Sequence, residues 1–156
     1  LQDSILENIT LPALKSFSKT GFLTKSTMAQ YSDQMIARMN IKGKKEDACV
    51  NLSGGNQQKV VLAKWIATAP HVLILDEPTR GIDVGAKREI YQLMNELTDR
   101  GMSIIMISSE LPEIIGMSDR VAVIHEGKIT GILEGASISE EHIMTLATGG
   151  ENNETV

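Results

Sequence analysis

Two adjacent carboxylates, Asp76 and Glu77, directly follow the apolar run "HVLIL". Such a short continuous run predicts a strand buried on both faces of a parallel sheet, and ligands of these sheets bind beyond the carboxyl ends of the strands. Asp76 is suited to hold Mg²⁺ through water, because Mg²⁺ keeps several waters and takes one or two protein carboxylates. Glu77, on the opposite face, could polarise an attacking water. A solvated acidic turn before Pro78 explains an isolated "DEP" equally well.

The glycine pair in "LSGGNQQK", residues 52–59, is the second candidate site. Ser53, Gly54 and Gly55 at a predicted helix start offer unobstructed backbone N–H groups, a hydroxyl and the positive end of the helix dipole, which together suit a phosphate. A serine N-cap followed by a glycine turn is the structural alternative. That alternative does not explain why this segment precedes a buried strand ending in "LDEPT". The sequence therefore predicts a phosphate site here.

Helices dominate the predicted N-terminal part, and strands alternate with helices after it. A helix beginning near Ser4 is broken by Pro12, and a second helix spans about Thr27–Asn40. The second helix carries an apolar stripe that we interpret as core, with a partner groove as the alternative; its members are Met28, Tyr31, Met35, Ile36 and Met39.

Further along, the pattern predicts a helix after Gly55 and another that Gly101 ends. Strands are predicted at "HVLIL", "MSIIMIS" and "RVAVIH", with a hairpin turn at Glu126-Gly127 leading into a fourth strand. "ELPEIIGMSD" and "SISEEHIMTLAT" are predicted to be short helices, and the polar end "GGENNETV" a disordered tail.

Composition limits the possible functions. The chain has 156 residues, 42% of them apolar, and a formal net charge of −5, with the basic residues scattered, so it offers no footprint for nucleic acid. Cys49 is the only cysteine, which excludes an internal disulfide and predicts a buried thiol. His142 has no second ligand at chelating spacing and is predicted to lie at the surface. No apolar run approaches the roughly 18 residues that a transmembrane helix needs. The first residue is Leu1, not methionine, which suggests a fragment.

Four segments in this order and spacing resemble the nucleotide-binding subunit of ABC (ATP-binding cassette) transporters: "LSGGNQQK", "VLILDEPTRGID", "IIMISSELPEI" and "RVAVIHEGKI". They are similar to the signature, the Walker B strand with its D-loop, and the switch region. The resemblance is strong from Asn51 to about Gly135. "RGIDVGAK" and "LATGG" further resemble the second cassette of the ATPase of simple-sugar importers of the ribose type.

This resemblance implies an α/β fold: a partial ABC ATPase domain, P-loop NTPase-like, with a mostly parallel sheet flanked by helices. Residues 1–50 would be part of a helical subdomain, 51–148 the α/β core and 149–156 the tail. The expected cofactors are ATP and Mg²⁺. The expected partners are transmembrane permease subunits, a facing cassette and, indirectly, a periplasmic sugar-binding protein. The expected place is the cytoplasmic face of the bacterial inner membrane, where the subunit would be peripheral.

The resemblance also assigns roles to single residues. In this family the signature of one cassette closes over ATP held by the Walker A and Walker B motifs of the facing cassette. Asp76 would belong to the magnesium site and Glu77 would be the general base. The nucleotide contacts would come from Ser53, Gly54, Gly55, Asn56, Asp83 in the D-loop, and Ser109 at the switch position.

Three departures from the family pattern change what this cassette is expected to do. The Walker A form G-x-x-x-x-G-K-[ST] is missing, and "GIDVGAKR" does not replace it. Asn56 stands where glutamine is usual, and its shorter amide is expected to reach the nucleotide less well. Ser109 stands where the switch histidine is expected and lacks a long, chargeable side chain. We therefore expect an isolated fragment without ATPase activity, and a slow or silent site at Glu77 in the intact protein.

Two other functions remain open at this stage. A soluble ABC ATPase of translation or DNA repair would share the signature and Walker B, although coiled-coil or basic insertions are missing. A non-catalytic interaction module would neither bind nor hydrolyse ATP. Exposed strand edges could also drive a non-native dimer of the fragment.

Overall fold

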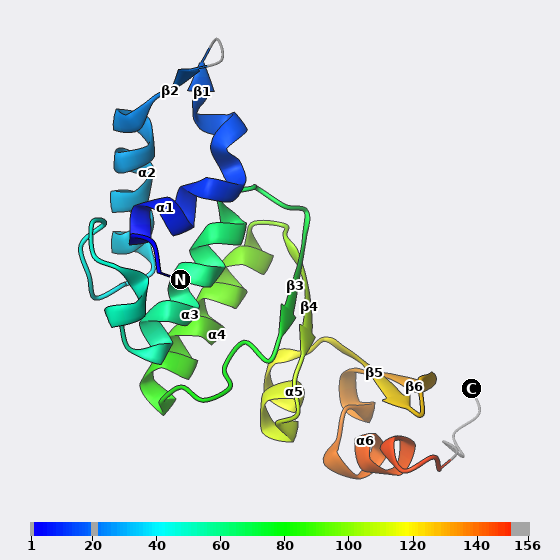
Figure 1. The fold of residues 1–156 in the computed structure, drawn as a ribbon. Coiled ribbons are helices and arrows are strands. Elements are labelled where there is room, and N and C mark those ends of the chain that lie inside the picture. Colours follow the sequence, from blue (N-terminus) through cyan, green and yellow to red (C-terminus); the bar gives the residue numbers. More distant parts are fainter. Residues whose placement is uncertain (1, 20–21, 151–156) are drawn as a thin grey trace. The chain divides into compact units, whose positions relative to one another are not determined.

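The computed structural model describes residues 2–19 and 22–150, which form six helices, three 3₁₀ turns and six strands (Figure 1). The helices are α1 (Ile5–Thr10), α2 (Lys25–Arg38), α3 (Gly54–Ile66), α4 (Val84–Asp99), α5 (Leu111–Met117) and α6 (Glu140–Ala147). The 3₁₀ turns span Leu11–Phe17, Cys49–Asn51 and Gly135–Ser137. The strands are β1 (Ser18–Lys19), β2 (Phe22–Leu23), β3 (Val72–Asp76), β4 (Ser103–Ile107), β5 (Arg120–His125) and β6 (Lys128–Glu134). This mixture of helices and strands confirms the predicted α/β class.

The chain divides into two compact units, Leu1–Ile107 and Ser108–Val156. In the first unit α1 packs against α2 and α3, and α4 packs against α3 and β4 (Figure 1). The helix α1 begins with a capping box, in which Ser4 Oγ accepts from the Glu7 backbone and the Glu7 carboxylate accepts from the Ser4 backbone. Pro12 sits in the first turn of the following 3₁₀ helix, as expected of a residue that cannot continue α1.

The apolar stripe predicted on α2 is core only in part, since Met28, Tyr31 and Ile36 are half-buried. Met35 is buried within α2 and Met39 directly after it, while the rings of Phe17 and Tyr31 pack with centroids 5.3 Å apart. Cys49 is also fully buried, which confirms the predicted buried thiol; burial raises its pKa, and Asn8 Nδ2 donates to its Sγ at 3.3 Å. These contacts tie the N-terminal helices to the segment that leads into α3.

The prediction that the "HVLIL" strand is buried on both faces is wrong for this chain. β3 pairs in parallel with β4, and side chains alternate along it, with Leu73 and Leu75 buried but Val72 and Ile74 50% and 64% exposed. Ile105 of β4 is 52% exposed on the same face. The helix α4 packs against β4, and within residues 2–19 and 22–150 the outward face of the strand pair remains exposed. An exposed apolar face of this size is typical of a surface that packs against another element or a partner.

The described strands pair as three two-stranded sheets, of which only β3–β4 is parallel. In the second unit β5 and β6 form the predicted hairpin, with Glu126 and Gly127 at φ +47° and +76° in its turn. The helix α6 lies on this hairpin, and a Cβ atom on Gly131 would come within 2.6 Å of Leu146. The core of the unit consists of Val121, Val123, Leu133, Ile143 and Leu146.

Two further predictions concern the ends and the membrane. Gly149 and Gly150 still bond to α6, and residues 151–156 of the predicted tail lie outside the described residues. Of the helices in the described ranges, none combines the length and the apolarity that a bilayer crossing requires.

Candidate functional site

The signature segment begins the helix α3. Ser53 is its N-cap, in extended conformation, and the Ser53 side chain makes no capping hydrogen bond to the first turn. Ser53 and Gly54 are exposed, whereas Gly55 is buried. The first N–H groups of a helix have no partner inside the helix, and they carry the positive end of its dipole. The start of α3 therefore presents a hydroxyl and backbone donors to an anion from outside.

The two glycines have different surroundings. A Cβ atom on Gly55 would lie 2.7 Å from the Cβ of Ala86 in α4, closer than real Cβ atoms come to one another. A Cβ atom on Gly54 would lie 3.9 Å from Ile82 and 4.0 Å from the Gly81 carbonyl, which is ordinary contact. Gly55 is thus explained by helix packing. Only Gly54 and Ser53 offer the open surface that a phosphate site needs.

Asn56 joins the signature to the loop before it. Its Oδ1 accepts from the Lys42 backbone N–H at 2.9 Å, and its Nδ2 donates to Ser53 Oγ at 2.8 Å. The expectation that Asn56 itself reaches toward a nucleotide is untested, but in this arrangement both ends of its amide are already bonded within the chain.

A half-buried ion pair joins α3 to α4. Lys59 Nζ contacts the Glu89 carboxylate and donates to the Asn40 carbonyl at 3.1 Å, while Asn40 Nδ2 donates to Glu89 Oε1 at 3.3 Å. The Lys59 side chain is 7% exposed and that of Glu89 41%. Hydrogen bonding to Lys59 lowers the pKa of Glu89 below its ordinary value of 4.5. The pair borders a cavity of about 210 Å³ lined also by Arg38 and Glu96.

The two candidate catalytic carboxylates lie at the end of β3. Asp76 is the last residue of the strand, exposed, and paired in register with Ile107. Glu77 is half-buried, and its φ of +48° takes the chain out of the strand; its N–H donates to the Ile107 carbonyl at 2.8 Å. Strand alternation therefore does not by itself fix the direction of the Glu77 side chain, and its placement on the face opposite Asp76 stays a prediction. A non-glycine residue in this backbone region is strained, and such strain clusters at functional sites.

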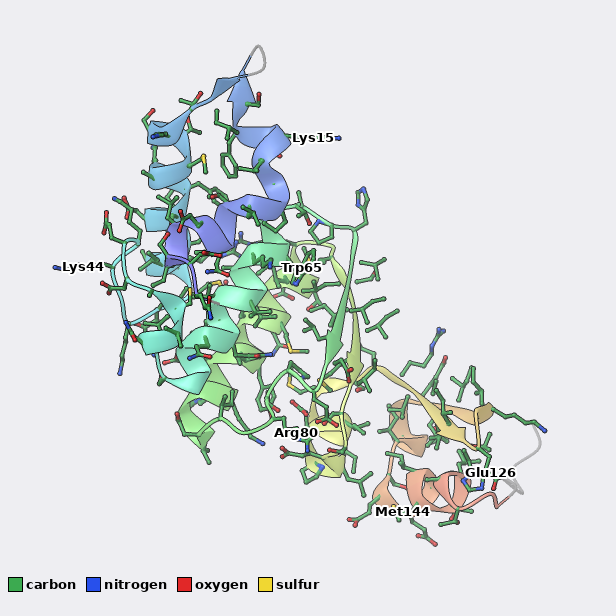
Figure 2. The ribbon with its side chains drawn as sticks, viewed as in Figure 1. Lys15, Lys44, Trp65, Arg80, Glu126 and Met144 are labelled. Carbon is green, nitrogen blue, oxygen red and sulfur yellow. The ribbon has the colours of Figure 1, made fainter. Side chains whose placement is uncertain are left out.

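Asp83 is the N-cap of α4. The Ala86 backbone N–H donates to Asp83 Oδ1 at 3.0 Å, and this bond holds the pKa of Asp83 below its ordinary value of 3.8. Capping by itself explains an aspartate here, so its contact with a facing cassette stays a prediction. The loop between β3 and α4 carries Arg80 (Figure 2), and it brings Ile82 and the Gly81 carbonyl next to Gly54 at the start of α3.

Ser109 belongs to the second unit, where it is exposed. The preceding residue, Ser108, donates from Oγ to the buried Glu113 carboxylate and accepts from the Glu110 N–H at 3.0 Å. These bonds fix the chain immediately before α5 and leave Ser109 facing outward.

The first unit thus brings together the start of α3 and the D-loop, and carries Asp76 and Glu77 at the other end of the same loop. Over the described ranges, His, Cys, Asp and Glu side chains do not form any group of three that could hold a metal ion. The sequence reading missed Lys59 and Glu89. The available signal was a lysine at helical spacing between Gly55 and Leu62, on the buried stripe of α3.

Sequence comparison identifies relatives over nearly the whole chain. Residues 2–80 match the profile of the family described as ABC transporter. The ribose import ATP-binding protein RbsA of Bacillus licheniformis is 64% identical over 151 residues, covering 96% of this chain and 31% of that protein. The protein of the same name from Bacillus subtilis strain 168 is 61% identical over 151 residues, with the same coverage of 96% and 31%. The chain therefore spans about a third of the length of the curated relatives it matches.

Solved structures share the fold. A nucleotide-free ATP-binding cassette from an ABC transporter aligns with a TM-score of 0.75 at 18% identity, covering 94% of this chain and 60% of that one. A dimeric ATP-binding cassette bound to ADP and Pi in a post-hydrolysis state aligns with a TM-score of 0.73 at 21% identity, covering 84% and 56%. At these sequence identities the likeness shows the fold alone. The sequence matches confirm the resemblance to ribose-type import cassettes that the motifs indicated.

Proposed function

The chain belongs to the ABC transporter family, and from that premise we propose that it is part of the ATP-hydrolysing subunit of an importer for a simple sugar such as ribose. In this proposal it supplies the signature in trans to ATP on a facing cassette. The curated relatives named for ribose import support the substrate class. The dimeric cassette with ADP and Pi supports an arrangement in which two cassettes share nucleotide.

One observation carries the proposal: the open start of α3. Ser53 and Gly54 are exposed, and the Ser53 side chain makes no capping hydrogen bond. A triphosphate bound elsewhere could approach this surface and meet the hydroxyl and the N–H groups head-on. Charge-assisted hydrogen bonds of this kind are about twice as strong as neutral ones.

The carboxylates at the end of β3 provide the chemistry of this chain's own site. Asp76 offers one exposed carboxylate, which fits Mg²⁺ that is held mainly by phosphate oxygens and water. Bound there, Mg²⁺ would neutralise charge on the phosphates. Glu77 would accept a proton from the attacking water, and its backbone bond to Ile107 holds it at the strand end.

We propose that the two composite sites of the intact protein are unequal. By the family resemblance Ser109 is the switch residue of the cassette that carries Glu77, and a serine has no charge to offer a γ-phosphate. The productive site would be the other one, to which this chain contributes Ser53 and Gly54. The permease subunits and the inner-membrane location follow from the same proposal, and no observation favours the soluble ATPase.

Binding of Mg²⁺-ATP tests the proposal. Calorimetric titration of Mg²⁺-ATP into the chain alone should give no binding heat. A facing cassette that carries Walker A should then bind the chain in the presence of ATP, and Ser53→Ala should weaken that complex. The matched control is Ser139→Ala, the N-cap of α6 in the second unit. Micromolar binding of ATP to the chain alone would refute the half-site, and an ATP-independent complex would favour an interaction module.

A further inference from the structure

Asn56 determines which way the Ser53 hydroxyl can bond. The Lys42 backbone N–H can only donate a hydrogen bond, and its nitrogen lies 2.9 Å from one end of the Asn56 amide. That end must therefore be the oxygen, Oδ1, because an NH₂ group cannot accept this bond. The orientation of the amide, which is often ambiguous, is fixed by the backbone.

The other end of the amide is then the NH₂ group, which lies 2.8 Å from Ser53 Oγ. An NH₂ group can only donate, so Ser53 Oγ must accept this bond. Its own hydrogen remains, and in the described ranges the Ser53 hydroxyl donates it to no protein acceptor. Ser53 is exposed at the start of α3, where the helix dipole favours an anion.

We propose that Asn56 is a positioning residue, which holds Ser53 as an outward hydrogen-bond donor for a phosphate oxygen. The proposal rests on the proposed function, because the phosphate comes from ATP on the facing cassette. The proposal also gives a role to Asn56, which stands where the family usually has glutamine. Asn56 acts on the nucleotide through Ser53, without touching it.

Substituting Asp or Leu for Asn56 separates this role from a structural one. In Asn56→Asp the carboxylate can only accept, so it keeps the Lys42 bond but draws the Ser53 hydrogen to itself. In Asn56→Leu both bonds are lost, and the Ser53 hydroxyl can still turn outward. A merely structural role predicts the larger loss for Asn56→Leu, since that variant frees the loop at Lys42. Positioning of Ser53 predicts the larger loss for Asn56→Asp.

The experiment measures the rate of ATP hydrolysis, at saturating ATP, in the intact importer ATPase that contains this chain. We expect Asn56→Asp to lower the rate at least about tenfold, as loss of a preorganised donor does, and Asn56→Leu to lower it within about threefold. In a Ser53→Ala background Asn56→Asp should have almost no further effect, because the hydroxyl it acts through is gone. Thermal unfolding of each variant checks that the fold is kept.

Two results would overturn the inference. One is a larger loss for Asn56→Leu than for Asn56→Asp. The other is an effect of Asn56→Asp that persists undiminished with Ser53→Ala, which would mean that the new charge repels the nucleotide directly. If Ser53→Ala alone leaves the rate unchanged, the proposed function itself fails, and that result is distinct from both.

Discussion

Gly54 and Gly55 differ in what a methyl group would meet, and alanine substitution should separate their roles. In Gly55→Ala the new Cβ atom would lie 2.7 Å from the Cβ of Ala86. Carbon atoms pack at about 3.5–4.0 Å, so α3 and α4 would have to separate by about 1 Å. Overpacking of this kind costs about 1–3 kcal/mol, and the better helix propensity of alanine returns up to about 1 kcal/mol. We expect a net loss of about 1–2 kcal/mol.

The partner residue supplies the matched control. Ala86→Gly removes the obstructing methyl group, so the double variant with Gly55→Ala should be more stable than the sum of the two single changes predicts. Gly54→Ala should leave the stability unchanged, because its nearest neighbours would be 3.9 and 4.0 Å away. The same Gly54→Ala should nevertheless lower ATP hydrolysis in the intact protein, since a methyl group at the exposed start of α3 would crowd an approaching phosphate.

The assay is urea unfolding of the chain, followed by the fluorescence of Trp65. Trp65 lies on α3 (Figure 2), so it reports on the helix whose packing is changed. A Gly55→Ala variant as stable as the parent would refute the packing argument. So would an Ala86→Gly change that fails to rescue it. If Gly54→Ala proves the more destabilising of the two, the assignment of roles is reversed.

Three further predictions concern the ion pair and the uncovered face. Glu89→Leu should lower the unfolding free energy by about 1–2 kcal/mol, less than for a fully buried pair because the Glu89 side chain is 41% exposed. Lys59→Met should cost less, because the lysine that Glu89→Leu leaves without its carboxylate is the more deeply buried partner; denaturant melts test the order. The lowered pKa of Glu89 means that its contribution is complete above 4.5 and is lost as pH falls below that value. The stability gap between parent and Glu89→Leu should therefore shrink from pH 7 to pH 3, and a constant gap would contradict the pairing. The apolar face of β3 and β4 should drive self-association at high concentration; sedimentation should show it reduced by Ile74→Asp, and a monomeric parent would exclude it.

Most elements of the fold could be predicted because their signals are local. The break at Pro12, the stop at Gly101 and the turn at Glu126-Gly127 each depend on the conformational limits of one or two residues. Burial of β3 could not be predicted in the same way. An apolar run shows that a strand belongs in a core, but whether both faces are covered depends on residues far away in the sequence or outside it.

The site was predictable as a set of residue types, and its internal contacts were not. From its sequence context, Gly55 was predicted to be part of a phosphate site. In the structure a glycine is needed there because Ala86 of α4 packs too closely for a side chain. Asn56 looked like a weakened nucleotide contact, and its amide joins Ser53 to Lys42. Ala86 and Lys42 lie outside the signature, so no pattern within it could reveal these two contacts. Lys59 had a sequence signal, a charge on an apolar stripe, but its partner Glu89 did not stand out.

The unequal use of the two composite sites is the central claim, and paired substitutions in the intact importer ATPase test it most directly. The measurement is the steady-state rate of ATP hydrolysis for Ser53→Ala and for Glu77→Gln. We predict that Ser53→Ala lowers the rate far more, by about tenfold or greater, because it removes a donor from the productive site. Glu77→Gln should leave most of the rate, since it alters only the site of the cassette whose switch position carries Ser109 in place of histidine. Comparable losses for the two variants, or a larger loss for Glu77→Gln, would contradict the claim.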